Sequence, residues 1–596
     1  MRKIAAIVNI LVLCLLLIPG IDAWAKSDLR VRKVSFSGNQ IYDDSRLTRL
    51  MLSRPSAFLH RSYFYPEILE TDIENILNFY HQNGYLEASI GEKGIMIDTV
   101  GNKVDISISL NEGELTRVEG ISIFGNEAFD DSTLLSLVNL RKDDPFRKIN
   151  IQDGMLAMIS LYAENGYLDA TIRPEIKLNS EAHLAMIDFA VTEKVPARIS
   201  SIKIEGLKKT HTDIIKRELL FNAGDTIKYS TLLKSQRQLY MTGLFESVFI
   251  RPVAVSDNDP SQKDILVDLN ESMSSEFNTS IGFGSIDKVR GRIEILTTNL
   301  AGTARKAGGA ISGSFIRRAA EASFTEPYTF GTRWRTDVNS MIEYMDEPGY
   351  NFLRYGGRLT FGHYFAEKFF ITISYRHEDS RLSHVETLER PDDFKPKVRS
   401  FILSISRDTR DNLFNPLRGS YFEWNNEVAG TFLQGTNSFA RSIIRLKKFH
   451  PLNRETIIAS AVEIGWIDNF RSGDEIPLNE RFYAGGPNTI RGYGYQLVGP
   501  IQADGVPLGG NFKIVWNIAE VRRTLYKIIG GVVFVDAGNV WSEVNDFTFR
   551  DIRVAAGTGL RVNTPLGIVR LDYGVNLDRR GSEPRDKIFF SMGQAF

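Results

Sequence analysis

The fold of this chain is decided near its C-terminus, where residues 569–575 read VRLDYGV. Every second residue of this stretch is apolar, and the residues between them are an arginine, an aspartate and a glycine. Because successive side chains of a strand point to opposite faces, one face is apolar and the other polar. Residues 400–406 and 554–562 alternate in a related way. A membrane barrel and a soluble β-sandwich both require this pattern, so alternation alone leaves both open.

Strand-length alternation extends over the whole second half of the chain. It begins near Glu276 and is interrupted by Gly, Asn, Asp and Pro, which favour turns. Residues 275–596 number 322. At roughly 20 residues per strand and connection, this length gives about 16 strands, an even number typical of outer-membrane barrels. We therefore predict a 16-stranded antiparallel transmembrane β-barrel over residues 275–596.

The N-terminus has the pattern of an export signal. Two basic residues precede the apolar residues 4–18, and AWA at residues 23–25 fits the small-x-small cleavage pattern, so we predict a signal peptide over residues 1–25. Cys14, the only cysteine, lies inside it, so the mature chain would have no disulfide. After residue 25 no apolar run reaches the ~18 residues that a membrane helix needs. Membrane passage would therefore be made by strands, which favours the barrel over the sandwich.

The end of the chain must close this barrel. The last residue, Phe596, lies on the same face of the last predicted strand as Phe590, and a terminal aromatic residue resembles the recognition signal of bacterial outer-membrane barrels. The first strand, residues 277–284, would meet the last, residues 589–596. Gly593 weakens the interior of that last strand. The seam marked by Phe590, Gly593 and Phe596 is therefore predicted to be weak.

The first half of the chain repeats one pattern three times. A strand-like segment ends near a glycine each time, as VSFSGN (34–39), ISIFGN (121–126) and IKIEGL (202–207). The three glycines lie 87 and 81 positions apart. A single Gly-Asn pair usually marks only a turn, but three copies in phase indicate three related modules.

Each module contains a second marker after an amphipathic helical segment. NGYL at residues 83–86 recurs at residues 165–168 and, more weakly, as TGLF at residues 242–245. Its glycine is expected to end the helix in the left-handed region, before two alternating strands close the module. The predicted order is strand, helix, helix, strand, strand, which makes each module α+β. The module boundaries are placed at residues 29–114, 115–196 and 197–273.

The most specific motif is YAGGPNTIRGY at residues 483–493. Four further motifs accompany it, namely Thr325–Tyr328, Asp408–Asn412 with Pro416 and Gly419, Phe534–Trp541, and Gly557–Tyr573 with Pro565 and Gly567. Together they cover nearly the whole second half, which resembles the barrel of the BamA/TamA superfamily. The three modules resemble the polypeptide-transport-associated repeats of the same superfamily.

This resemblance implies a location and a mechanism. The barrel would lie in the outer membrane of a Gram-negative bacterium, with the repeats in the periplasm. The loop that carries Arg491, Gly492 and Tyr493, preceded by Gly485 and Gly486, would fold back into the barrel lumen. The repeats would bind extended peptides by strand addition, and the barrel would open sideways at its seam to insert or export other proteins.

Elementary electrostatics suggests partners for Arg491. A guanidinium group inside a narrow lumen needs a carboxylate or carbonyl groups in place of water. Strand parity places Asp536 and Asp572 on the lumen side, so Arg491 is expected to pair with one or both of them. A solvated loop arginine is the commoner alternative, but the glycines around Arg491 favour a close-packed loop.

Nothing in the sequence indicates an enzyme. The eight histidines show no metal-binding spacing, and no nucleophile elbow or phosphate-binding loop occurs. We therefore predict no catalytic residue, no metal and no cofactor. The formal net charge of −1 argues against nucleic acid as a partner. A barrel phospholipase is the enzymatic alternative, and a passive export pore similar to two-partner secretion transporters is the non-enzymatic one.

The number of repeats suggests a subgroup of the superfamily. Three repeats are similar to TamA, whereas a core BamA-type factor usually carries five and a two-partner secretion transporter two. A TamA-like factor is favoured over a core factor with fewer repeats. The partners implied are outer-membrane lipids, unfolded outer-membrane proteins as clients, and an inner-membrane-anchored, periplasm-spanning protein or lipoprotein subunits.

Overall fold

The computed structural model describes residues 29–55, 62–256, 259–366, 368–386, 394–430, 433–453, 455–470, 475–565, 567–581 and 583–595. The predicted signal peptide and Phe596 lie outside the described residues. In the described part of the chain, no helix combines the length and apolarity needed to cross a membrane. The chain forms two compact units, one with the first two repeats and part of the third, the other with the rest of the third repeat and the barrel.

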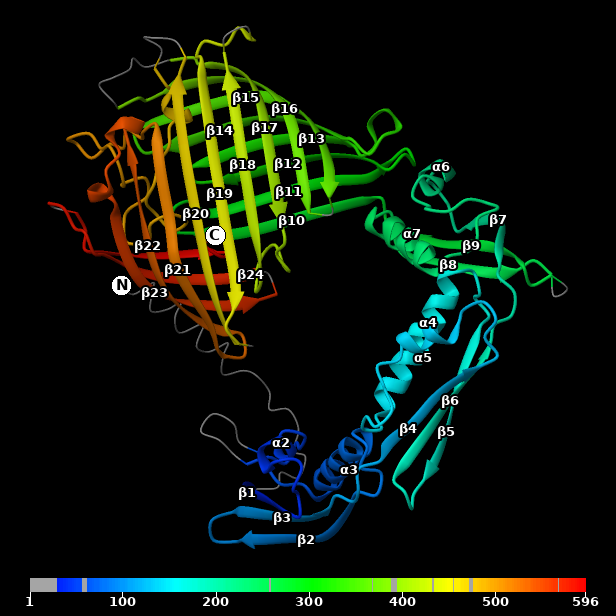
Figure 1. Ribbon diagram of the computed structural model, residues 1–596. Helices are drawn as coiled ribbons and strands as arrows, with labels where there is room; N and C mark the ends of the chain where they lie inside the picture. Colours follow the sequence, from blue (N-terminus) through cyan, green and yellow to red (C-terminus); the bar gives the residue numbers. More distant parts are fainter. Residues whose placement is uncertain are drawn as a thin grey trace. The chain divides into compact units, whose positions relative to one another are not determined.

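Each repeat is a three-stranded sheet accompanied by a short and a long helix (Figure 1). The first repeat contains β1 (Arg30–Ser37), α2 (Asp44–Thr48), α3 (Pro66–Gln82), β2 (Ser89–Asp98) and β3 (Lys103–Asn111). The second contains β4 (Arg117–Phe124), α4 (Asp131–Ser136), α5 (Lys148–Glu164), β5 (Thr171–Asn179) and β6 (Leu184–Thr192). The third contains β7 (Arg198–Glu205), α6 (Thr212–Lys216), α7 (Tyr229–Met241), β8 (Phe245–Ala254) and β9 (Gln262–Glu271). The predicted order of strand, helix, helix, strand, strand is confirmed.

In each sheet the last strand of the repeat lies in the middle. The strand orders are β1-β3-β2, β4-β6-β5 and β7-β9-β8. β1 and β4 run parallel to β3 and β6, whereas β2 and β5 form antiparallel hairpins with them. The parallel pairs require a crossover, which the two helices provide.

In each repeat, a carboxylate at the end of the last strand accepts hydrogen bonds from the turn that follows the first strand. In the second repeat, Glu193 accepts hydrogen bonds from two backbone N–H groups of the turn after β4, at 2.8 and 2.9 Å, and from the hydroxyl of Tyr162 at 2.6 Å. Glu112 and Glu271 hold the corresponding turns of the first and third repeats. Each turn begins at the repeated glycine, whose φ is between +81° and +86°. These contacts explain why glycine and the acidic strand end recur in phase.

The stability of the second repeat is expected to depend on the charge of Glu193. Burial opposes the charged form, but hydrogen bonds from Tyr162 and the turn outweigh it and lower the pKa of Glu193. Stability from a lowered pKa is present above the unfolded-state pKa of about 4.3 and is lost as pH falls through the folded-state value. We expect Glu193→Gln to destabilise this turn by roughly 1 kcal/mol at neutral pH, because the neutral amide is a weaker acceptor.

Hydrogen exchange of the turn, compared between variant and parent at each pH, measures this effect. The difference should be largest at neutral pH and should shrink between about pH 5 and pH 3, as the parent carboxylate is protonated. Glu119→Gln, at an exposed position of β4, is the matched control. Equal exchange of variant and parent at neutral pH would contradict the expectation.

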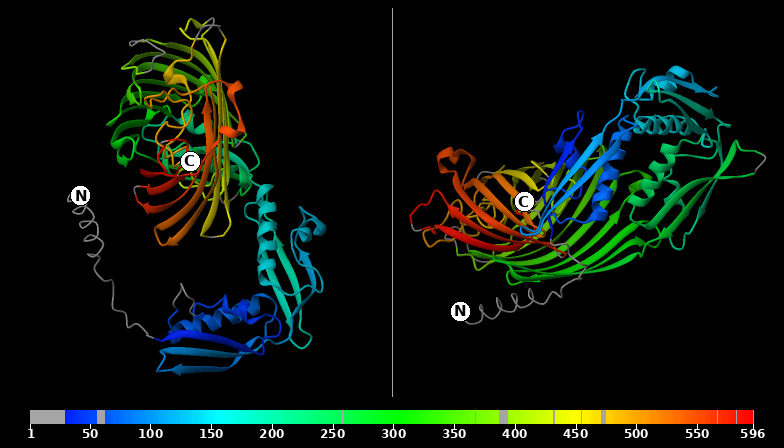
Figure 2. Two further views of the ribbon diagram at one scale, coloured as in Figure 1. Left: turned by 90° about the vertical axis from the view of Figure 1, so that its left-hand side faces the viewer. Right: turned by 90° about the horizontal axis from the view of Figure 1, so that it is seen from below.

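The second unit contains a 16-stranded antiparallel sheet curled into a nearly closed barrel (Figures 1 and 2). Its strands follow chain order and are β10 (Ser275–Gly284), β11 (Lys288–Leu300), β12 (Arg305–Ser314), β13 (Arg317–Glu326), β14 (Arg335–Glu347), β15 (Tyr350–Ala366), β16 (Phe369–Ser383), β17 (Lys397–Asp408), β18 (Gly419–Ala429), β19 (Phe439–Pro451), β20 (Thr456–Asn469), β21 (Phe512–Tyr526), β22 (Ile529–Trp541), β23 (Arg553–Thr564), β24 (Gly567–Asn576) and β25 (Asp586–Met592). The predicted strand number and antiparallel direction are confirmed.

β24 illustrates how the wall separates two environments. Arg570 and Asp572 point to the inner face and are buried, whereas Leu571 and Tyr573 on the outer face are exposed. An apolar exterior with polar side chains inside is the arrangement that a barrel surrounded by lipid requires.

Candidate functional site in the barrel lumen

The loop between β20 and β21 lies against the inner face of the barrel wall. The structure describes it from residue 475 onward, where it begins with a short 3-10 helix, η3 (Leu478–Glu480). Its Ile490 and Tyr493 are buried in an apolar cluster with residues of β21–β23, namely Val515, Val540 and Ala555. The loop therefore fills part of the space that the strands enclose.

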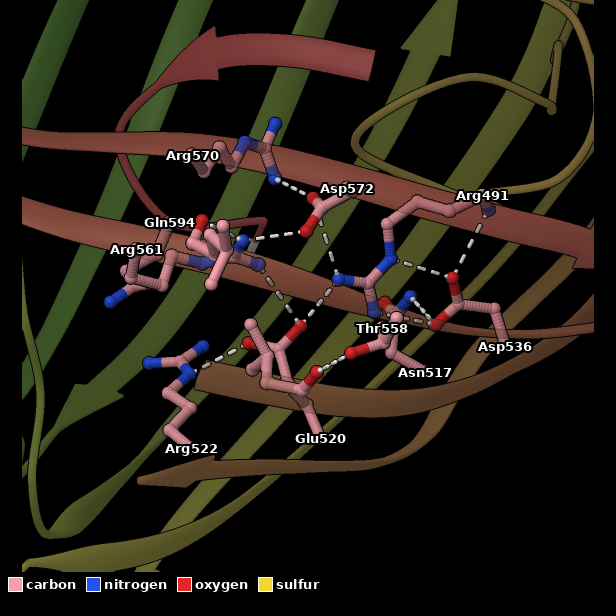
Figure 3. Close-up of polar contacts among 12 residues, drawn as sticks. Arg491, Asn517, Glu520, Arg522, Asp536, Thr558, Arg561, Arg570, Asp572 and Gln594 are labelled. Atoms are coloured by element: carbon pink, nitrogen blue, oxygen red, sulfur yellow. Dashed lines mark hydrogen bonds and ion pairs between the residues drawn. The ribbon is translucent and has the colours of Figure 1, made fainter. Parts of the chain in front are cut away.

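Arg491 lies at the centre of the loop tip and is completely buried, at 0 % exposed (Figure 3). Its Nε donates to Asp536 Oδ2 at 2.8 Å, and its Nη2 donates to Asp536 Oδ1 at 2.9 Å. Its Nη1 lies 2.5 Å from Glu520 Oε2 and 3.8 Å from Asp572 Oδ2. One guanidinium group thus joins three carboxylates from β22, β21 and β24, which is the fork geometry that arginine provides.

Further groups complete the environment of these carboxylates. Arg561 donates to Asp572 at 2.6 Å, and Arg522 donates to Glu520 at 2.7 Å. Asn517 donates to Asp536 at 2.9 Å. Nη1 of Arg570 lies 3.8 Å from Asp572 Oδ2. Four arginines, counting Arg491, therefore face three carboxylates, and each carboxylate has an arginine partner, as burial requires. The guanidinium carbon of Arg491 also lies 3.5 Å from the centre of the Phe534 ring.

Glycines allow the loop to approach the wall closely. Gly492 has φ +123°, and a Cβ on it would lie 2.9 Å from the Cβ of Ala555. On β24, a Cβ at Gly574 would lie 2.6 Å from the backbone of Arg491 and Gly492. Tyr493 follows with its hydroxyl donating to Asn576 Oδ1 at 2.5 Å. Backbone and wall are in direct contact at this point, which side chains larger than hydrogen would prevent.

The two earlier glycines of the motif shape the loop itself. Gly485 and Gly486 have φ +102° and +107°, values that favour glycine. A Cβ on Gly485 would lie 2.4 Å from the carbonyl oxygen of Gly494, on the returning part of the loop. The structure therefore places all five motif residues in one folded segment, and brings Asp536 and Asp572 to Arg491.

Sequence reasoning missed Glu520. β21 contains a bulge between Asn517 and Ala519, after which the inward positions change from odd to even numbers. A bulge inserts one extra residue and so reverses the parity on which the assignment depends. The signal available in the sequence was the pair of charged residues, Glu520 and Arg522, on either side of Val521.

The seam joins the two ends of the hydrogen-bonded strand order, β10 and β25. Ser285, just beyond β10, donates its N–H to the carbonyl of Phe590 at 2.8 Å. Its hydroxyl donates to the same carbonyl at 3.1 Å and accepts from the N–H of Phe590 at 2.7 Å. β25 ends before Gly593, which has φ +94° and donates to the carbonyl of Ile568 on β24 at 2.7 Å. The contact thus lies at one end of the first strand and near the end of the last.

Two family models match the chain. The Omp85 superfamily domain matches residues 299–596. The surface antigen variable number repeat matches residues 29–113, 116–194 and 197–272. The chain therefore belongs to the Omp85 superfamily, with three repeats before the barrel.

Several proteins similar to this chain are named BamA. The chain is 25 % identical to the outer membrane protein assembly factor BamA of Nitratidesulfovibrio vulgaris, over 95 % of this chain and 73 % of that protein. It is 23 % identical to BamA of Neisseria meningitidis, over 95 % of this chain and 78 % of that protein. The crystal structure of Haemophilus ducreyi BamA lacking POTRA domains 1–3 has the same fold, with a TM-score of 0.69, 20 % identity and coverage of 80 % of this chain and 99 % of that one. These relatives are named BamA, and the TamA-like subgroup stays a prediction.

Proposed function

We propose that this chain is an assembly factor that inserts β-barrel and autotransporter-type proteins into the outer membrane. The seam is the observation that carries the proposal. Neighbouring strands elsewhere in the wall pair over seven to 15 residue pairs. Among the described residues, the hydrogen bonds across the seam join Ser285 to Phe590. At roughly 1 kcal/mol for each hydrogen bond, the three bonds contribute roughly 3 kcal/mol, which a client strand can replace by pairing with β10.

The side chains of β10 support a role as a template edge. Phe277 and Ile281 are 66 % and 75 % exposed, and β10 is the first strand of the sheet order. A terminal strand offers backbone N–H and C=O groups to an incoming chain, and such pairing needs little side-chain specificity. The proposal requires no catalytic residue, because client folding supplies the free energy.

The repeats supply a second set of edges. β2 lies at one edge of its sheet, and its Ile95, Met96 and Ile97 are exposed. We assign this edge to strand addition by clients or by partner subunits, which include lipoproteins and an inner-membrane-anchored, periplasm-spanning protein. Lipid contacts of the barrel exterior complete the set of partners.

Reconstitution into lipid vesicles tests the proposal. The mature chain is expected to speed the folding of an unfolded outer-membrane barrel client by at least ~10-fold, a change of about 1.4 kcal/mol in the barrier. Folding is measured by the heat-modifiable gel mobility of the client, and vesicles containing an unrelated porin serve as the control. A client that folds equally fast in both preparations would contradict the proposal.

Single-channel conductance distinguishes the export-pore alternative. The loop lies within the lumen and its apolar side chains pack on β21–β23, which supports an insertase rather than an open pore. Deleting residues 477–500 should then increase conductance. Steady conductance of the intact chain, together with no client folding, would favour the pore.

A further inference from the structure

A second buried ion cluster lies where the lumen loop begins. Glu480, the last residue of η3, is 4 % exposed. Its carboxylate accepts from Arg376 on β16 and, at 2.7 Å, from Nη1 of Arg441 on β19. The carbonyl of Leu478 in the same turn accepts from the hydroxyl of Tyr483 at 3.0 Å. The base of the loop is thus bound to strands other than those that hold its tip.

Glu480 is one of three buried carboxylates that pair with the two arginines. Both also pair with Glu427 on β18, Arg376 at 3.2 Å, and Glu427 accepts from Ser400 at 2.6 Å. Arg376 and Glu427 are buried. Nε of Arg376 also lies 3.7 Å from Glu378, so two carboxylates remain near the arginines when Glu480 is removed. Each arginine nevertheless loses the carboxylate of Glu480, to which it donates. Leaving a buried charge without its partner is strongly unfavourable.

We propose that Glu480 is a positioning residue that anchors the base of the loop independently of Arg491. The tip is held by carboxylates of β21, β22 and β24, and the base by arginines of β16 and β19. The two anchors are separated by 11 positions in the chain. The inference deepens the proposed function, on which its meaning for client insertion rests, but the anchoring itself is tested without any client.

Two anchors on one loop act as a tether. When one is lost, the other keeps the freed part close to its site, so re-formation is frequent and net release is small. When both are lost, this local concentration disappears and the loop leaves the wall. Loss of either anchor should therefore loosen the loop, and loss of both should release it.

Cysteine labelling measures the release. Val498, 2 % exposed, lies on the returning part of the loop, where its N–H donates to the carbonyl of Ala484 at 3.0 Å. With Cys14→Ser, Val498→Cys is the only cysteine of the full chain. Its rate of reaction with a water-soluble maleimide is measured in the folded barrel in lipid vesicles, on the Glu480→Gln and Arg491→Ala backgrounds, alone and combined.

Each single variant is expected to raise the labelling rate by about tenfold and the double variant by at least about 100-fold, since each removes one partner of a buried charge pair. Glu423→Gln is the matched control. It removes a lumen carboxylate of β18 that pairs with Arg445 at 2.8 Å, outside the base cluster, and should stay within about twofold of the parent.

The outcomes distinguish two claims, namely that Glu480 anchors the loop and that this anchoring contributes to client insertion. If Glu480→Gln does not change labelling on the Arg491→Ala background, or if Glu423→Gln raises labelling equally, Glu480 is not an anchor. If Glu480→Gln fails to fold, Glu480→Asp, which shortens the side chain, should show a smaller increase of the same kind, and no increase there would also refute the anchor. If labelling increases but the rate of client folding is unchanged, Glu480 is an anchor of the loop but has no part in client insertion.

Discussion

Ser285→Cys and Phe590→Cys, combined in one chain and oxidised, are expected to abolish client insertion and to leave the barrel folded. The N–H of Ser285 lies 2.8 Å from the carbonyl oxygen of Phe590, so the two backbones are neighbours, as a disulfide requires. The covalent bond would replace a seam held by roughly 3 kcal/mol of hydrogen bonds. A client strand could then no longer separate β10 from β25.

The rate of client folding in vesicles should fall by at least ~100-fold in the oxidised protein, a change of about 2.7 kcal/mol in the barrier, and should recover on reduction. The two single-cysteine variants control for loss of the native side chains. Ala322→Cys with Ser340→Cys is the matched disulfide, because these residues lie directly opposite each other on β13 and β14, within the wall. Full insertion by the oxidised seam variant would refute sideways opening.

Arg491→Ala is expected to destabilise the folded barrel by about 3–5 kcal/mol. It is also expected to slow client insertion. The substitution removes the guanidinium group that pairs with the buried Asp536, whereas Glu520 and Asp572 keep other arginine partners. The measurement is the temperature at which heat-modifiable mobility is lost, alongside the insertion rate.

Two further arginine variants sharpen this test. Arg491→Lys should fall between parent and alanine, because an ammonium group keeps the charge but cannot contact Asp536 through two nitrogens in a fixed plane. Arg523→Ala removes an exposed arginine of β21 and should behave as the parent. An Arg491→Ala protein with the parent's transition temperature and insertion rate would show that the pairing has no role in holding the loop.

The regular parts of the barrel could be predicted from the sequence because strand parity is local. Over residues 569–575 of β24 every second residue is apolar, so the inward direction of Asp572 followed from its neighbours. The same reasoning placed Asp536 on the lumen side. Glu520 was not assigned, and parity counted from Asn517 would have placed it on the outer face, because the bulge in β21 shifts parity by one and no turn residue or proline marks it in the sequence.

The register of the seam could not be predicted for a different reason. Hairpin registers are fixed by short turns and by the faces that alternation defines. Ser285 and Phe590 are 305 positions apart, so no local turn sets which residues meet. The prediction of a last strand over residues 589–596 with Gly593 in its interior was wrong, because β25 ends at Met592. The sequence also did not indicate that the contact would fall beyond the end of β10.

The repeats were predictable because the same contacts recur in all three copies. The third copy lacks the asparagine of the first two, yet Glu271 still accepts from the backbone of its turn. Backbone N–H groups are present whatever the side chains are, so the carboxylate is the more persistent marker. A search based on the acidic strand end would find divergent copies that a Gly-Asn search overlooks.

The missing side chain at Gly574 forms a notch in the wall. The backbone of Arg491 and Gly492 lies in this notch. Asp572 and Asn576 are the neighbouring residues on the same face of β24, one on each side of Gly574. A loop seated in this way cannot slide along the strand, because a side chain blocks each direction. It can leave only by lifting away from the wall, and so release of the guanidinium group must come before any sideways travel of the loop.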